Sequence, residues 1–136
     1  MKAKPVLPDS NMSPKVGTKI PDGTIYAGIS PDTGRPMYTT PSDAPLTHTF
    51  NAAKKYASKL DAHGHQDWRV PTEGELNLLF NNRAAIGGFN VAGTYQDGWY
   101  WSSSQYDRYN AEVERFSDGT PGYYDKADLA SLRLVR

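Results

Sequence analysis

Apolar residues recur at helical spacing in the stretch from 48 to 62. The stripe they form consists of Phe50, Ala53, Ala57 and Leu60. Residues spaced three and four apart lie on one face of a helix, so this stretch is predicted to be an amphipathic helix with one buried face. Thr47 or Thr49 is the expected N-cap, because a threonine hydroxyl can accept a hydrogen bond from a free backbone N–H of the first turn.

A second helix is predicted by the segment that starts at Thr72. Thr72 and Glu75 have the spacing of a capping box, in which each side chain accepts a hydrogen bond from the other residue's backbone N–H. The buried stripe that follows consists of Leu76, Leu79 and Phe80. The pair Asn81-Asn82 is the expected end of this helix.

Strand-like segments flank the two helices on both sides. β-branched and aromatic residues between turn signals predict strands, here at 24–29, 37–40, 99–104, 111–116, 123–124 and 132–135. Asp118-Gly119 is a hairpin signal, and 84–98 is expected to be a long loop rich in glycine. Because the helices are segregated from most strands, the order predicts an α+β fold.

Residues 1–20 differ in composition from the rest of the chain. They contain three Pro, two Ser and four Lys and few large apolar side chains, which predicts a flexible N-terminal tail or linker. The remaining residues, 21–136, have the length of a single domain.

Charge and composition exclude several function classes. Lys plus Arg and Asp plus Glu balance at 15 each, which argues against a nucleic-acid partner. No apolar run reaches the ~18 residues of a membrane helix, so no membrane insertion is expected. No secretory signal follows the first residues, and localisation stays open. The absence of Cys excludes disulfides, thiolate metal sites and a Cys nucleophile.

The distribution of charge and aromatic residues is uneven. Residues 1–70 hold nine basic and six acidic residues, whereas 71–136 hold six basic and nine acidic, so the halves carry +3 and −3. Six Tyr, two Trp and one Phe fall within 95–124. Such density is typical either of a β core or of a binding surface.

Several motifs in fixed order carry a resemblance to a known family. They are Trp68-Arg69-Val70-Pro71-Thr72, Glu75-Leu76, Trp99-Tyr100-Trp101-Ser102-Ser103-Ser104, Arg115-Phe116-Ser117-Asp118-Gly119 and Arg133-Leu134-Val135-Arg136. Together they resemble the Lcl C-terminal domain family over residues 16–136. That family is similar to the C-type-lectin-like group, whose members include formylglycine-generating enzymes and the variable proteins of diversity-generating retroelements.

The resemblance implies a C-type-lectin-like fold, with two helices flanking a small antiparallel sheet and with long loops. It also implies a ligand-binding face built by residues 99–136, the segment that adenine-directed mutagenesis rewrites in retroelement targets. Framework positions would be Trp99, Trp101, Ser102, Ser103, Phe116, Asp118, Gly119 and Leu132. Displayed ligand-binding positions would be Tyr106, Asp107, Arg108, Tyr109, Asn110, Glu112, Glu114, Thr120, Tyr123, Tyr124, Asp128 and Leu129.

This sequence departs from its relatives at two positions. Glu112 follows Ala111 where relatives often have Trp, which is consistent with a diversified position, and Leu134 stands where they often have Cys. The oxygen-dependent formylglycine-generating relatives rely on active-site Cys, so their activity does not transfer to this chain.

Some residues could instead indicate a metal site. The segment His63-Gly64-His65-Gln66-Asp67, with His48, offers imidazole and carboxylate ligands, but a polar loop after a helix is the preferred interpretation. Calcium is the one ion left open, at Asp125, Asp128 and Asp118, although EF-hand spacing is missing. We expect no cofactor.

Two further groups of side chains are catalytic candidates. Ser102, Ser103 and Ser104 lack a nucleophile elbow and are expected to bond to the backbone. Glu112 and Glu114, spaced i, i+2, share one strand face; an acid/base pair is one reading and an acidic contact patch the preferred one. Arg69 and Arg133 flank apolar residues and are expected to make buried pairs.

The sequence therefore predicts a non-catalytic ligand-binding module whose partner is a protein or a glycan. Tyr side chains would supply contact area, and acidic and amide groups would select hydrogen-bonding partners. The alternatives are a Cys-free enzyme related to the formylglycine-generating group and a polysaccharide-binding adhesin domain, which would need a basic groove.

Overall fold

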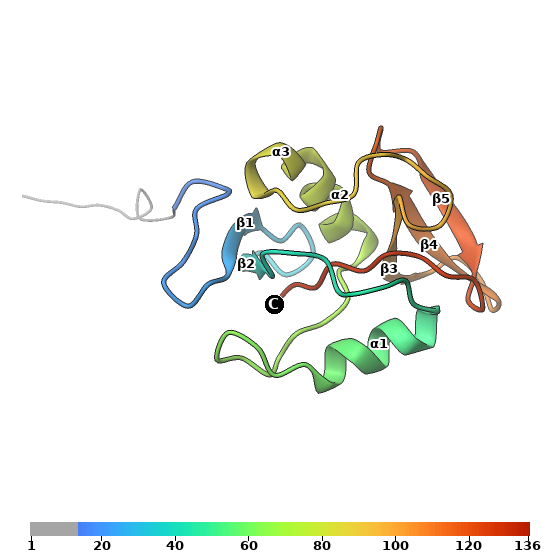
Figure 1. Ribbon diagram of the computed structural model, residues 1–136, viewed down its shortest axis with the longest axis horizontal. Helices are drawn as coiled ribbons and strands as arrows, with labels where there is room; N and C mark the ends of the chain where they lie inside the picture. Colours follow the sequence, from blue (N-terminus) through green and yellow to red (C-terminus); the bar gives the residue numbers. More distant parts are fainter. Residues whose placement is uncertain (1–13) are drawn as a thin grey trace, which may run out of the picture.

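The computed structural model describes residues 14–136 and contains three helices and two small antiparallel sheets (Figure 1). The elements are β1 (Ile25–Ile29), β2 (Pro36–Thr39), α1 (Phe50–Lys59), α2 (Glu73–Asn81), α3 (Arg83–Ile86), β3 (Trp99–Gln105), β4 (Asn110–Arg115) and β5 (Pro121–Asp125). The predicted α+β class is confirmed. Among the described residues the longest helix has 10 residues, too short to cross a bilayer.

The N-terminal sheet pairs β1 with β2, and the chain before β1 lies against it. Gly17 N–H donates to Tyr26 O and Tyr26 N–H donates to Thr18 O, both at 2.9 Å. Residues 14–20, assigned to the tail from composition, therefore pack on the domain. The rest of the predicted tail, residues 1–13, lies outside the described residues.

The larger sheet has the order β3-β4-β5. Both connections are hairpins, and the β3–β4 register shifts between Trp101 and Gln105. In the β4–β5 turn, Gly119 has φ +79°, and a Cβ there would lie 2.5 Å from the Phe80 ring. Glycine is therefore required both by the left-handed backbone and by the close approach of α2.

The last residues of the chain connect the two sheets. The predicted terminal strand at 132–135 is wrong: this segment makes isolated bridges instead of a regular strand. Arg136 exchanges two backbone hydrogen bonds with Tyr38 of β2, each of 2.9 Å, while Ser131 bonds to Trp99 and Trp101 of β3. The segment runs between partners in two separate sheets (Figure 1), so it does not extend either ladder.

The two longer helices pack on opposite faces of the larger sheet. Phe50 of α1 meets Trp101 edge-on at 5.6 Å between ring centroids, within one apolar cluster. Leu76 and Leu79 of α2 belong to a second cluster that contains Tyr100. Because neighbouring residues of a strand point to opposite faces, Trp101 and Tyr100 divide the core into these two clusters.

The helix ends follow the local sequence signals closely. Thr49 caps α1 by accepting a hydrogen bond from Ala52 N–H. The capping box of α2 is confirmed, with Glu75 N–H donating to Thr72 and Thr72 N–H donating to Glu75. The predicted loop 84–98 begins with the single-turn helix α3, which the glycine-rich pattern did not indicate.

Candidate functional site

One face of the β3-β4-β5 sheet is only partly covered. Residues directly opposite in an antiparallel pair share a face, and here Glu114 lies opposite Tyr100 while Glu112 lies opposite Tyr123. Tyr100 is fully buried under α2, whereas Tyr123 is 52% exposed. The helix therefore covers one end of this face and leaves the other end open.

An aromatic pair occupies the open end. The rings of Tyr106 and Tyr123 stack at 4.0 Å between centroids with an angle of 6° between their planes. Tyr106 is 55% exposed, so both rings keep a large area toward solvent. We refer to these two rings as the tyrosine platform. An exposed aromatic surface of this kind is well suited to contact a ligand, since it offers a large apolar area at low cost in conformational entropy.

The turn after β3 holds Tyr109 beside this region. Asp107 accepts hydrogen bonds of 2.8 Å from the backbone N–H groups of Tyr109 and Asn110. These bonds lower the pKa of Asp107, with the Tyr109 N–H as the main cause. Tyr109 is 65% exposed, and the Arg108 guanidinium lies 5.6 Å from its ring. Asp107 and Asn110 thus shape the turn, while Tyr109 and Arg108 face solvent.

Two carboxyl groups meet next to the platform. Glu73, exposed at the start of α2, places its carboxyl beside that of Glu112 on β4. A hydrogen bond between these carboxyls, burial and the charge of Glu73 raise the pKa of Glu112 to about 7. Glu73 is held there because its backbone N–H donates to the Ser104 hydroxyl of β3 at 3.0 Å. The sequence contained no signal for this contact, since the two glutamates are 39 positions apart in the chain.

Glu114 lies beneath this pair. The expectation that it is displayed is wrong: it is 5% exposed, because α2 covers that part of the sheet face. Its Oε2 has no hydrogen-bond partner among the described residues. Burial and the charge of Glu73 raise the pKa of Glu114 to about 7, and Arg83 opposes this increase. Period-two alternation correctly placed Glu112 and Glu114 on one face but did not reveal which part of it the helix covers.

The burial of Glu114 predicts a pH-dependent loss of stability. Its pKa in the fold lies above its usual value of 4.5, so the folded state holds the proton more tightly than the unfolded state. The resulting stabilisation is complete below pH 4.5 and is lost as pH rises toward 7. Glu114→Gln is expected to gain about 1–3 kcal/mol at about pH 8 and to reduce this decline.

Urea unfolding at about pH 5 and about pH 8 tests this expectation. Asp61→Asn, which removes an exposed carboxyl near the end of α1, is the matched control and should keep the decline. A Glu114→Gln protein with the same decline as the control would contradict the assignment.

The remaining predicted ligand residues do not join the platform. Tyr124 points to the other face and is half-buried against Trp99, at 5.7 Å between ring centroids. Thr120 donates to Asp118 at 2.7 Å and helps to close the β4–β5 turn. The backbone N–H of Asp128 donates to Asp125 O at the end of β5, and the neighbouring Leu129 is 39% exposed. The predicted set therefore separates into more than one surface.

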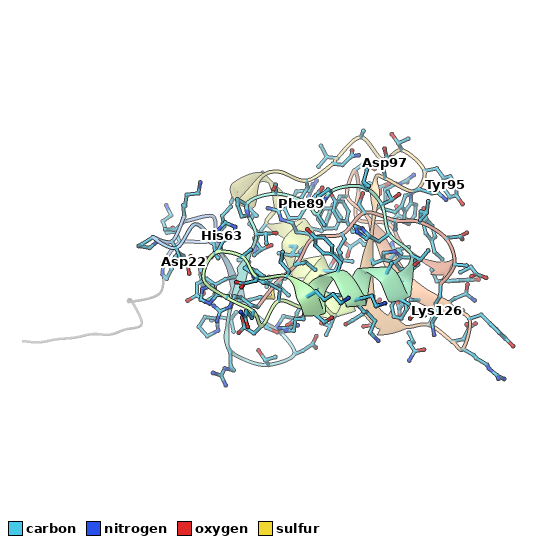
Figure 2. All side chains as sticks on the ribbon, turned by 60° about the horizontal axis from the view of Figure 1, so that its bottom comes forward. Asp22, His63, Phe89, Tyr95, Asp97 and Lys126 are labelled. Atoms are coloured by element: carbon cyan, nitrogen blue, oxygen red, sulfur yellow. The ribbon has the colours of Figure 1, made fainter. Side chains whose placement is uncertain are left out.

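Several of the other candidate groups are engaged in structural contacts. His65 pairs with Asp22 at 2.8 Å and His63 contacts the Asp22 backbone oxygen (Figure 2). Within residues 14–136 no three His, Asp or Glu side chains are placed to hold a metal ion. Ser102 is buried and donates to Glu112 O at 2.8 Å. Asp125 accepts from Ala127 N–H at 2.8 Å within its own turn.

A basic hollow of about 460 Å³ lies on the side of the N-terminal sheet. Arg35, Arg69 and Arg136 line it together with Asp67. Arg69 is bound by Glu75 and Arg136 by Asp67, so two of the three guanidinium groups already have partners. This hollow was not predictable from residue spacing, because the three arginines come from distant parts of the chain.

The fold and this surface define a small α+β domain with two antiparallel sheets and an exposed patch of tyrosine and carboxyl groups. The Lcl C-terminal domain family matches residues 30–136, and the chain belongs to this family. The resemblance found from the motifs is thereby confirmed, although the match starts at residue 30 and not at 16. A comparison with curated proteins gave no match.

Proposed function

We propose that this chain is a non-catalytic ligand-binding module with a C-type-lectin-like fold. The observation that carries the proposal is the tyrosine platform, in which two stacked rings remain more than half exposed. Large apolar side chains cost free energy when they stay in water, and their grouping on one patch is typical of an interaction site. Serine catalysis is disfavoured, since Ser102 is buried and bonded to the backbone.

The chemistry around the platform fits a protein or glycan ligand. Tyr109 and Arg108 extend from the neighbouring turn, and Glu112 lies opposite Tyr123 in the sheet. Aromatic rings supply contact area, while the carboxyl, guanidinium and hydroxyl groups give direction through hydrogen bonds. This combination binds through a surface and needs no deep pocket.

Screening on protein and glycan arrays is the experiment that identifies a ligand. For the ligand found, Tyr123→Ala is expected to weaken binding about 10- to 30-fold, because truncation of a central aromatic anchor removes about 1.4–2 kcal/mol. The dissociation constant is measured by calorimetry or by biolayer interferometry.

Tyr95→Ala is the matched control. Tyr95 is also exposed, at 67%, but it packs beside Tyr124 and outside the platform. The Tyr95→Ala variant should therefore have the same dissociation constant as the wild-type protein. Equal losses in the two variants, or none in Tyr123→Ala, would argue against the platform as the binding site.

The family resemblance also supports the proposal that this chain is the hypervariable target protein of a diversity-generating retroelement. Tyr106, Tyr109 and Tyr123, three of the proposed displayed positions, are more than half exposed, as a rewritten surface requires. Deep sequencing of the 3′ end of the gene tests this version. Clustered adenine-directed variation with a nearby template repeat would support it, and an invariant segment without such a repeat would refute it.

A second candidate function is a polysaccharide-binding adhesin domain. The basic hollow favours it, because Arg35 has no ion-pair partner within residues 14–136 and lies near two more arginines. Guanidinium groups bind sulfates well. Retention on heparin that decreases with salt and is lost in Arg35→Ala would support this candidate, and elution at low salt would exclude it.

A further inference from the structure

We propose that Glu73, Glu112 and Glu114, together with the tyrosine platform, form a receptor for a cationic side chain, a lysine or arginine of a protein partner. We refer to the three carboxyl groups as the glutamate cluster. The inference rests on the proposed function and specifies the ligand chemistry of the same surface.

The glutamate cluster is assembled from two elements. Glu112 and Glu114 share one face of β4, and Glu73 reaches them from the N-terminus of α2, fixed by its backbone bond to Ser104. Glu73 is exposed and Glu112 half-buried, so both can be reached from solvent. Tyr123 lies directly opposite Glu112 on the same face, which makes the carboxyl groups continuous with the aromatic rings.

A further observation is that one carboxyl oxygen of the glutamate cluster, on Glu114, lacks a hydrogen-bond partner among the described residues. Glu114 is 95% buried, and its Oε2 accepts no hydrogen bond from the part of the chain that the structure describes. Buried polar atoms are almost always bonded, because an unmade bond costs about 1–3 kcal/mol. Among residues 14–136, Arg83 is the one cation that acts on Glu114, but its guanidinium lies over the Phe80 ring at 3.9 Å and donates to Phe80 O.

The chemistry favours an organic cation over a metal ion. No three acidic or imidazole groups within residues 14–136 have an arrangement that would hold a metal. An ammonium or guanidinium group distributes several N–H donors over a larger volume than a metal ion, which suits carboxyl groups at different depths. It is also attracted by the face of a tyrosine ring, and two such rings adjoin the cluster.

Below about pH 7, protons on Glu112 and Glu114 neutralise the charge that a bound cation would otherwise neutralise. The groups that face the buried carboxyl are Glu73 of α2, Arg83 of α3, Tyr100 of β3 and Glu112 of β4. Burial and the charge of Glu73 raise the pKa of Glu114 to about 7. The contact with the Glu73 carboxyl, together with burial, raises the pKa of Glu112 to about 7. A bound cation would displace these protons, so affinity should increase as pH rises through about 7.

Amide chemical shifts measured by NMR during titration with small probes test the proposal. The probes are Nα-acetyl-lysine methylamide and its arginine analogue, with the norleucine analogue as the neutral control. We expect saturable shifts at Glu73, Glu112 and Tyr123 for both cations, with a dissociation constant on the order of millimolar for so small a ligand. Binding should be about tenfold weaker at about pH 6 than at about pH 8.

Two variants distinguish a specific role of the glutamate cluster from a general effect of negative charge. Glu112→Gln and Glu73→Gln should each weaken binding of the cationic probes at least about fivefold. Asp61→Asn removes the same charge far from the cluster and should not change it. The amide spectrum of each variant reports whether it folds, and Glu73, exposed at a helix terminus, is the safer of the two substitutions.

The outcomes distinguish this inference from the proposed function. Equal shifts with lysine and norleucine probes, or no effect of the two glutamine variants, would overturn the cation receptor. Saturation of the same amides by calcium chloride, without a response to the organic cations, would overturn it in favour of a metal site. An array ligand that needs Tyr123 but is insensitive to Glu73→Gln and Glu112→Gln would leave the platform function intact while the inference fails.

Discussion

Replacing Arg133 by alanine is expected to lower the free energy of unfolding by about 3–5 kcal/mol. The side chain is fully buried. Its guanidinium donates to Thr40 O at 2.8 Å, to Gly87 O at 3.0 Å and to the Asp43 carboxylate at 3.2 Å. Truncation would leave all three acceptors without this donor and would open a cavity beside them. Removal of one partner from a buried pair is costly because the other charge remains buried.

Urea unfolding at neutral pH measures the effect. Arg136→Ala is the matched control, since Arg136 forms an ion pair with Asp67 in which both side chains reach solvent, and such surface pairs contribute about 0–1 kcal/mol. Arg133→Lys keeps the charge but loses the fork of donors and should lie between the two. Equal losses for Arg133→Ala and Arg136→Ala would contradict the structural role of Arg133.

Replacing Glu75 by glutamine is expected to destabilise the domain by about 3 kcal/mol at neutral pH. Glu75 is fully buried. It accepts bonds of 2.6 and 2.8 Å from Arg69, a bond of 2.6 Å from Ser30 and one of 3.0 Å from Thr72 N–H. The carboxylate thus joins the first turn of α2 to Ser30, which follows β1, and to Arg69, which forms an isolated bridge with Val135. A neutral amide keeps the size of the side chain but cannot accept all four bonds.

The pH dependence of this effect has a definite sign. Burial by itself raises the pKa of Glu75, but the bonds from Arg69, Ser30 and Thr72 outweigh it and lower the pKa from 4.5 to about 2. The stabilisation is therefore complete above pH 4.5 and is lost as pH falls through about 2. The wild-type protein should lose stability over this interval, and Glu75→Gln should show a much smaller dependence.

Thermal or urea unfolding between about pH 2 and about pH 7 measures both curves. Asp67→Asn is the control, because Asp67 pairs with Arg136 at a site that is 63% exposed. It should cost at most about 1 kcal/mol. A Glu75→Gln protein that declines in acid as steeply as the wild type would refute the assignment.

Interactions between near neighbours in the chain were predictable from spacing alone. The capping box joins Thr72 to Glu75 only three residues away, and the N-cap Thr49 contacts Ala52. The apolar neighbours of Arg69 and Arg133 also predicted buried pairs; Arg133 forms one with Asp43, whereas Arg69 pairs with the buried Glu75 but is itself 40% exposed. Such features depend on local geometry and on burial beside apolar residues, which a sequence displays directly.

The candidate site was predictable only in part. The sequence identified a segment rich in tyrosine and acidic residues, and Tyr106, Tyr109 and Tyr123 are indeed exposed. It did not reveal that Tyr124 packs on Trp99, because neighbouring residues of β5 point to opposite faces. Nor did it reveal that α2 covers Glu114, since alternation assigns a residue to a face but not to a helix above that face.

The sequence by itself determined the α+β class, the caps of the two longer helices and the family. The tertiary structure alone decided the stack of Tyr106 on Tyr123, the meeting of Glu73 with Glu112 and the path of residues 130–136 between the sheets. The physical reason is the range of the interactions. Hydrogen bonds within one helical turn follow from residue spacing, whereas contacts between distant segments depend on strand register and on which helix covers which end of the sheet.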